Sequence, residues 1–277
     1  MPKLQHLSYS AVTKYLTNPY EFHRCYVQKK YRDDTSPAAA VGTAMHKAIE
    51  MFYKGKSVES ALKDGEIELI KQKNQIRFGK TQTFDDCLAE YRTLTSVFFN
   101  APVFNPARVV SVEEAIVAEV EGLKIKLKAK TDLLGRAENG DLIIFDWKKV
   151  SAYTNPEVIL GYDREGQALT EEMIPAKYFI QAFFNARTIK AQYREDPKSM
   201  IFVEIKAAKN RDGSPQIRQY HIDLTNEDVQ KDFARITQLV NHIAEEVEHR
   251  EKWLPNFDDM FIGDLVWREW LMEETKV

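Results

Sequence analysis

The chain has 277 residues, and its 44% hydrophobic residues indicate a folded globular protein. The formal net charge of −3 gives no overall basic character, so any nucleic-acid interface must be a local patch. Its two cysteines, Cys25 and Cys87, are too few for a disulfide framework, a zinc ribbon or a four-cysteine iron–sulfur cluster. Because no apolar run could span a membrane and the polar start MPKLQHLSYS is no signal peptide, we expect a cytoplasmic protein.

The first hundred residues are expected to be helical. Amphipathic spacing and end signals predict helices over residues 7–18, 18–31, 41–55, 57–79 and 82–100. Asn18 is the expected N-cap of the second helix, with Pro19 at its first position. A polar loop is expected over 32–40, and Gly55 ends the helix that follows it.

His46 lies within the helix predicted over 41–55. A single histidine on a helix is most often structural, but an imidazole is also a competent ligand for Mn²⁺ and similar metals. The residues around it leave both interpretations open.

The hydrophobic pattern then changes to a period of two, which predicts strands over residues 109–120, 123–135 and 142–150. Lys126, Lys128 and Lys130 alternate along the middle strand and share a face with Asp132. This face is either the solvated side of an antiparallel strand or a track of phosphate-binding charges that leads to a metal.

The second and third strands are expected to form a hairpin that brings two aspartates together. A two-residue Asn139-Gly140 turn would pair Asp132 with Trp147 and put it on the wrong face. A three-residue loop with Gly140 in the left-handed region pairs Asp132 with Asp146 instead. Because directly opposed like charges destabilise a hairpin, two aspartates there suggest a bound cation.

Asp146 and Lys148 are two residues apart and therefore share this face. Two carboxylates supply the hard oxygen ligands that Mg²⁺ or Mn²⁺ prefers, and such a metal polarises a phosphate and lowers the pKa of a bound water. Lys148 would orient that water or stabilise charge on the phosphate, and the backbone carbonyl of Trp147 is a further candidate ligand. The alternative is a solvent-facing hairpin with scattered charges.

The remainder of the chain completes a mixed α/β core. A long loop, an apolar helix, two strands and a final helix are expected over residues 151–172, 174–193, 199–209, 215–224 and from 225 or 226 to about 250. Glu204 and Lys206 also fit an acidic-x-lysine pattern. No upstream hairpin supplies a second acid there, so we expect an ordinary strand with one polar face. The tryptophans of the tail, Trp253, Trp267 and Trp270, are expected to pack on the core.

The order of these motifs resembles the RecB-like branch of the PD-(D/E)xK nuclease superfamily. Residues 7–31 resemble its serine-rich opening helix and the helix after it, and VGTAMH matches its G-x-x-x-H motif. Asp132 with Asp146-Trp147-Lys148 matches the metal-binding aspartates and catalytic lysine, and YFIQAFFN resembles the Q-x-x-x-Y helix.

This resemblance implies a restriction-endonuclease-like α/β fold, in which a central mixed β-sheet is flanked by helices. A helical N-terminal part over 1–105 and a nuclease core over 106–277 would form one integrated domain. The resemblance places His46 among the metal ligands and Gln181 near the site.

The chain departs from the family pattern at several positions. Asn185 stands where the Q-x-x-x-Y motif has tyrosine, and Tyr178, one turn before Gln181, is a candidate substitute. Glu114 is a candidate additional acid, although Glu113 is as well placed by sequence. Some relatives, including CRISPR-adaptation nucleases, carry an iron–sulfur cluster on four cysteines, and none is expected here. Lys149 replaces the usual threonine or serine. With it, the candidate nucleic-acid contacts are Lys126, Lys128, Lys130 and Lys149.

The sequence therefore predicts a DNA nuclease that depends on Mg²⁺ or Mn²⁺. The resemblance favours an exonuclease in DNA recombination, DNA repair, or phage- or CRISPR-related DNA processing. The expected partners are DNA and a helicase, an annealing protein or a CRISPR or phage recombination protein, with no membrane. One alternative is a non-catalytic DNA-binding or scaffold protein on the same fold, although the intact acids, Lys148 and His46 argue against it. Another is an RNA-directed nuclease, because no reader of a 2′-hydroxyl can be identified.

Overall fold

A computed structural model describes residues 4–31, 34–101, 107–151, 176–209 and 211–254. Within them, six strands form a single sheet in which β1 (His6–Ser8), β3 (Lys126–Arg136), β4 (Leu142–Val150), β5 (Ser199–Lys209) and β6 (Pro215–Asp223) follow one another, and β2 (Arg108–Ala118) also pairs with β3. The β1–β3 and β4–β5 pairs are parallel and the others antiparallel. The predicted mixed sheet is confirmed.

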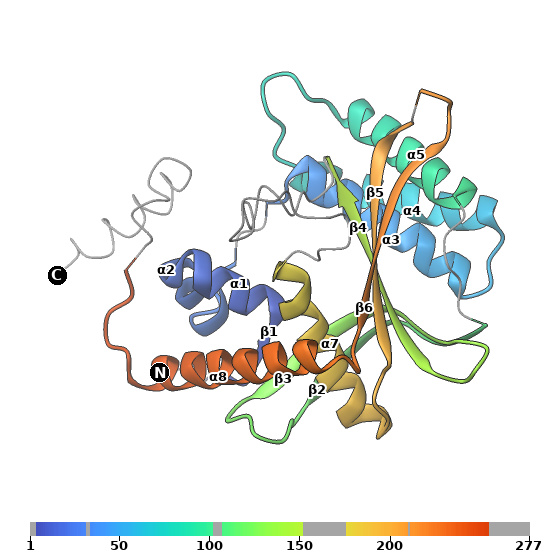
Figure 1. Cartoon of the computed structure of the whole chain (residues 1–277). Coiled ribbons are helices and arrows are strands. Elements are labelled where there is room, and N and C mark those ends of the chain that lie inside the picture. Colours follow the sequence, from blue (N-terminus) through green and yellow to red (C-terminus); the bar gives the residue numbers. More distant parts are fainter. Residues whose placement is uncertain (1–3, 32–33, 102–106, 152–175, 210, 255–277) are drawn as a thin grey trace, which may run out of the picture.

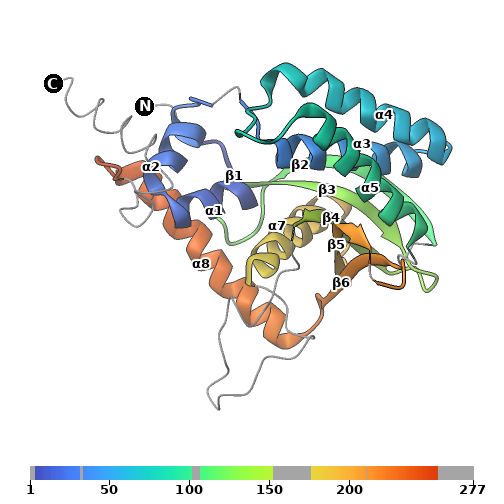
Figure 2. The same cartoon turned by 90° about the horizontal axis from the view of Figure 1, so that it is seen from above.

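Helices cover both faces of this sheet (Figures 1 and 2). On one face lie α3 (Pro37–Tyr53), α4 (Val58–Gln72) and α5 (Phe84–Asn100), and on the other α7 (Ala176–Tyr193), with α8 (Glu227–His249) packed outside it. Met45 and Tyr91 from the first group share a buried cluster with Phe145 and Trp147 of β4. A second cluster joins α7 and α8 to the opposite face. The site described below lies where β3, β4, α3 and α7 meet.

The N-terminal elements differ in part from the expectation. The first described residues form the short strand β1 before α1 (Tyr9–Thr17). This strand was not predicted, because three residues are too few to show a hydrophobic period. Asn18 caps α2 (Pro19–Phe22) as predicted, accepting a hydrogen bond from the backbone of Glu21 at 3.1 Å. A π-helical turn, η1 (His23–Val27), continues it. None of the helices in the described ranges is long and apolar enough to cross a membrane.

The loop predicted over 32–40 is wrong from Pro37 onward, because α3 begins there. The Ser36 hydroxyl accepts a hydrogen bond from the Ala39 backbone at 3.2 Å, and Pro37 occupies the first helical position. Proline at that position and the alanines after it both favour a helix. The helix ends before Gly55, whose φ of +93° fits its predicted role.

The β3–β4 hairpin has the predicted three-residue loop. Gly140 has a φ of +92°, and its N–H donates to the Ala137 carbonyl at 3.0 Å. The ladder pairs Leu133 with Phe145, as expected for that loop. The same register, extended by one residue on each strand, places Asp132 opposite Asp146.

The C-terminal half follows the predicted order. Helix α7 and strands β5 and β6 lie where expected, Asn226 rather than Thr225 is the N-cap of α8, and Trp253 packs on the core. A short 3-10 turn, η2 (Lys73–Gln75), follows α4. The loop expected over 151–172 lies outside the described residues except for its first residue, and Trp267 and Trp270 also lie outside them.

Candidate metal centre

Three carboxylates form a row across β2, β3 and β4. The β2–β3 register pairs Val112 with Leu133 and Glu114 with Thr131, which puts Glu113 opposite Asp132. The hairpin register puts Asp146 on the other side of Asp132. All three side chains are at least nine-tenths buried. Uncompensated, such a concentration of negative charge would be strongly unfavourable.

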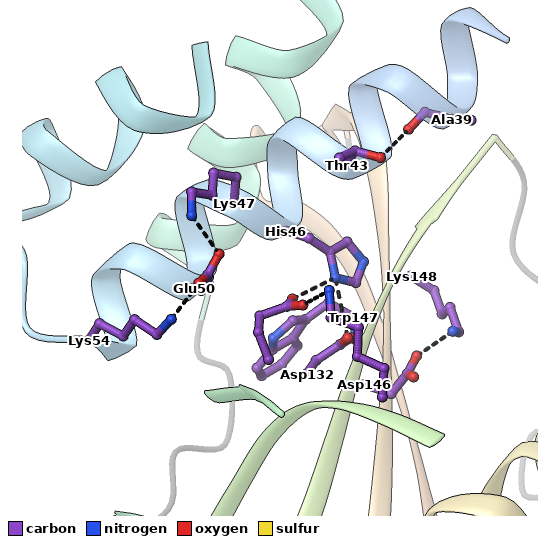
Figure 3. A network of polar contacts seen from close by, with 12 residues as sticks. Ala39, Thr43, His46, Lys47, Glu50, Lys54, Asp132, Asp146, Trp147 and Lys148 are labelled. Atoms are coloured by element: carbon purple, nitrogen blue, oxygen red, sulfur yellow. Dashed lines mark hydrogen bonds and ion pairs between the residues drawn. The ribbon is translucent and has the colours of Figure 1, made fainter. Parts of the chain in front are cut away.

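Helix α3 brings His46 over this row (Figure 3). Its Nδ1 lies 3.4 Å from Asp132 Oδ1 and 3.5 Å from Glu113 Oε1. In Figure 3 the imidazole points from the helix toward the strands, while Lys148 extends toward Asp146 from β4. The histidine thus approaches from one side of the acids and the lysine from the other.

Lys148 and Gln181 both contact Asp146. The Lys148 Nζ lies 2.5 Å from Asp146 Oδ1, and the Gln181 amide of α7 donates a hydrogen bond to Asp146 Oδ2. The structure therefore brings five of the predicted site residues together, His46, Asp132, Asp146, Lys148 and Gln181, from three separate parts of the chain.

The acids control the protonation of their neighbours. Burial opposes the charged form of His46, but Asp132 and Glu113 outweigh it and raise the pKa of His46 to about 10. Burial raises the pKa of Asp146 to about 6, with Lys148 opposing the shift and Asp132 adding to it. Burial would likewise raise the pKa of Asp132, but His46 and then Lys148 hold it below its usual value. In the metal-free protein, a proton on His46 thus supplies positive charge where a cation would bind.

These residues fit a divalent cation. One ligand atom from each of His46, Glu113 and Asp132 lies within 4.8 Å of the other two. Asp146 Oδ1 is buried and accepts no hydrogen bond from the described residues, because Lys148 approaches it as an ion pair outside hydrogen-bond geometry. Carboxylate oxygens with one imidazole are a suitable donor set for Mg²⁺ or Mn²⁺.

The cluster opens into a cavity of about 640 Å³ between α3, the strands and α7. His46, Asp132, Asp146, Lys148 and Gln181 all line it. Gly42, one turn before His46, also lines it, and a Cβ at this position would meet nothing within 4 Å. Position 42 therefore faces open space at the edge of the cavity.

Two candidate residues lie away from the acids. Glu114 points to the opposite face, where its carboxylate accepts a hydrogen bond from the Tyr193 hydroxyl at 2.6 Å. The expectation that Glu114 adjoins the metal is therefore wrong, and Glu113 takes that place. The Tyr178 hydroxyl donates to Glu204, a fully buried residue of β5, and Tyr178 does not line the cavity. The polar face expected around Glu204 is also wrong, since this carboxylate lies beneath α7.

Trp147 presents its backbone to the site and its ring to the core. Its N–H donates to Asp132 Oδ2 at 2.8 Å, while the ring stacks on Phe145 and Tyr53. Ligation by its carbonyl stays a prediction. Asn185 accepts a hydrogen bond from Thr131 at 3.2 Å.

The predicted phosphate-binding lysines fall into two groups. Lys126 and Lys149 are paired with acids, Glu119 at 3.1 Å and Glu90 at 3.0 Å. Lys130 pairs with Glu113 at the edge of the cavity. Lys128 is exposed and has no ion pair within the part of the chain that the structure describes.

A sequence model described as the PD-(D/E)XK nuclease superfamily matches residues 6–258. No curated protein matches the chain significantly. Among solved structures, twelve chains match, and one of them, titled "Crystal structure of SSO0001", is 16% identical. That alignment covers 87% of this chain and 85% of the other with a TM-score of 0.30, a similarity that supports no argument about function.

Proposed function

Because the chain belongs to the PD-(D/E)XK nuclease superfamily, whose members are metal-dependent nucleases, we propose that it hydrolyses phosphodiester bonds in DNA, as an exonuclease of the RecB-like kind. The observation that carries this proposal is the meeting of His46, Asp132, Asp146 and Lys148 at one open cavity. DNA recombination, repair or phage-related processing is the proposed setting.

His46, Glu113, Asp132 and Asp146 would hold Mg²⁺ or Mn²⁺. When bound, the cation supplies Lewis-acid polarisation of the phosphate and eases ionisation of water. The protein's own residues position the metal ligands and supply positive charge. Gln181 fixes the orientation of Asp146 through its hydrogen bond.

Lys148 supplies the positive charge that the reaction needs. Burial of its half-buried side chain opposes the charged form, but Asp146 and Asp132 outweigh this effect and raise the pKa of Lys148. The charged side chain is placed to orient the attacking water and to stabilise charge that develops on the phosphate. The water oxygen forms a bond to phosphorus as the ester P–O bond breaks. The water gives up one proton to the solvent, and the departing sugar oxygen takes one up.

The test is cleavage of end-labelled linear DNA and covalently closed circular DNA with Mg²⁺, Mn²⁺ or EDTA. The wild type is compared with Asp146→Ala and Lys148→Ala, and with Lys63→Ala as a matched surface control, because Lys63 is exposed on α4 and, among the described residues, pairs only with Glu59. We expect metal-dependent loss of linear DNA in the wild type and the control. Their cleavage rate should exceed that of the two site variants by about a thousandfold, which corresponds to about 4 kcal/mol of activation free energy.

Each other result has a defined meaning. Cutting of circles would show an endonuclease, and digestion of RNA in preference to DNA would change the substrate. Metal-dependent cleavage retained in Asp146→Ala would refute the assigned site. DNA binding without cleavage in any metal would favour a scaffold protein on this fold.

A further inference from the structure

A second cavity adjoins the metal centre. It has a volume of about 320 Å³ and lies between β1, the start of α1, η1, β3 and α7. Lys130 and Gln181 line both this cavity and the one that contains the acids. The two cavities therefore lie next to each other.

The strand arrangement explains why this cavity exists. Strand β2 occupies one edge of β3, so β1 and β4 share the other edge. Strand β1 pairs only as far as Lys128, and β4 only from Leu133 onward. Between these points the edge of β3 is unpaired, and Ala129 and Lys130 from this stretch line the cavity.

Two lysines from different elements give the cavity a positive charge. Lys29 follows η1 and Lys128 lies on β3, and both line the cavity. Neither has an acidic partner among the described residues, although most lysines that the structure describes around the sheet are paired. His6 lies between them: burial, then the charge of Lys128 and of Lys29, lowers its pKa. Two uncompensated ammonium groups that converge in this way form a site for an anion.

Tyrosines line the same cavity. Tyr26 and Tyr31 meet edge to face with ring centroids 6.5 Å apart, and Tyr31 is 59% exposed. Tyr31 therefore offers an aromatic ring to solvent in the same cavity as the two lysines. Tyr9 also lines the cavity. Aromatic faces beside lysines are the combination that binds unpaired bases and their phosphates.

We propose that this cavity receives an unpaired nucleotide next to the scissile phosphate, with its base against Tyr31 and its phosphate on Lys29 and Lys128. The volume is at the lower end of ligand pockets, about 300–1,000 Å³, and so admits one nucleotide rather than a base pair. The substrate is then single-stranded DNA or a single-stranded end. This inference rests on the proposed nuclease function for its meaning but is tested by binding.

The experiment measures binding of a fluorescent single-stranded oligonucleotide and of a blunt hairpin duplex of equal length, in EDTA, over a series of salt concentrations. The variants are Lys29→Gln/Lys128→Gln, Tyr31→Ala and Tyr31→Phe. The control Lys63→Gln/Lys231→Gln removes the same two charges from α4 and α8, where both lysines are exposed and pair within their own helices.

We expect the wild type to prefer the single strand. The double lysine variant should weaken that binding at least tenfold and reduce the slope of log affinity against log salt by about 0.7, because both lysines contact the same phosphate and each neutralised phosphate contributes about 0.7. Tyr31→Ala should weaken the binding of the single strand by about tenfold, whereas Tyr31→Phe, which keeps the ring, should bind it like the wild type. The control should bind like the wild type.

Equal binding of duplex and single strand, or pocket variants that behave like the control, would overturn the inference even if the protein cleaves DNA. Single-strand binding that depends on the pocket in a protein without cleavage would leave the inference intact and refute the nuclease function. Thermal unfolding of each variant establishes that it is folded, which the exposure of Tyr31 and of both lysines favours.

Discussion

The carboxylate of Asp132 accepts a hydrogen bond at 2.8 Å from the backbone N–H of Trp147. The bond lies just beyond Leu133 and Phe145, the last pair of the β3–β4 ladder toward the site. The side chain thus continues the strand pairing where the two backbones separate, while its other oxygen faces His46 at 3.4 Å. One residue therefore both holds β4 in place and contributes to the metal centre.

This double role predicts different effects for two substitutions. Asp132→Ala leaves the buried N–H of Trp147 without an acceptor, which costs about 1–3 kcal/mol of unfolding free energy. Asp132→Asn keeps an acceptor oxygen and should lose less, yet both variants should lose metal binding. Urea unfolding in EDTA measures the first effect, and the Mg²⁺-induced rise in melting temperature the second. If the two variants were equally stable, the hydrogen bond would not be what secures β4.

Adjacent glutamates on β2 provide a matched test of the ligand set. Glu113 adjoins His46 and Asp132, whereas Glu114 accepts a hydrogen bond from Tyr193 on the opposite face. Glu113→Gln should weaken Mg²⁺ or Mn²⁺ binding at least about tenfold, and Glu114→Gln should leave it unchanged. Calorimetric titration of both variants checks this. A larger loss in Glu114→Gln would show that the strand presents the other residue to the metal.

The sequence was sufficient to predict the hairpin because its turn has few solutions. Once Gly140 is placed in the left-handed region, the three-residue loop fixes the register, and with it the position of Asp132 opposite Asp146. The same alternation of residues on strands fixes Lys148 beside Asp146. Element order and the apolar character of α7 fix the rest of the fold class.

The sequence could not distinguish Glu113 from Glu114. Both lie on one strand, and the choice depends on the register of β2 against β3, which includes a bulge between Val109 and Ser111 and leaves Glu113 opposite Asp132. The residue pattern of β2 does not indicate that register. The second cavity could not be predicted from the sequence either. It depends on β1, which has three residues, and on Lys29, which a π-helical turn carries to the sheet.

Protonation of His46 predicts how metal binding depends on pH. Its pKa in the metal-free fold, about 10, lies above the ordinary 6.5, so the stabilisation from its pairing with the acids is complete below pH 6.5 and is lost as the pH rises toward 10. A metal ligand must be deprotonated, so Mg²⁺ competes with this proton. Its affinity should rise by up to about tenfold per pH unit between pH 6.5 and 8.5. Calorimetry in buffers of different ionisation enthalpy should detect the released proton. The same slope in His46→Gln would exclude His46 as its source.

Gln181 is predicted to act by positioning Asp146 rather than by contacting the metal. Its amide donates to Asp146 Oδ2 and leaves Oδ1 directed toward Lys148 and the cavity. Removing a partner that orients a metal ligand costs about 10- to 100-fold in metal affinity or activity, and we expect this for Gln181→Ala. Gln181→Glu should lower the metal affinity and activity further, because the new carboxylate beside buried Asp146 raises the pKa of the Asp146 carboxyl. Lys190→Ala is the control on the same helix, since Lys190 is exposed later on α7, where it pairs with Asp196. Activity measured against Mg²⁺ concentration separates the two possible roles. If Gln181 only positions Asp146, saturating Mg²⁺ should recover most of the activity of Gln181→Ala, whereas a persistent deficit would show that Gln181 acts on the substrate itself.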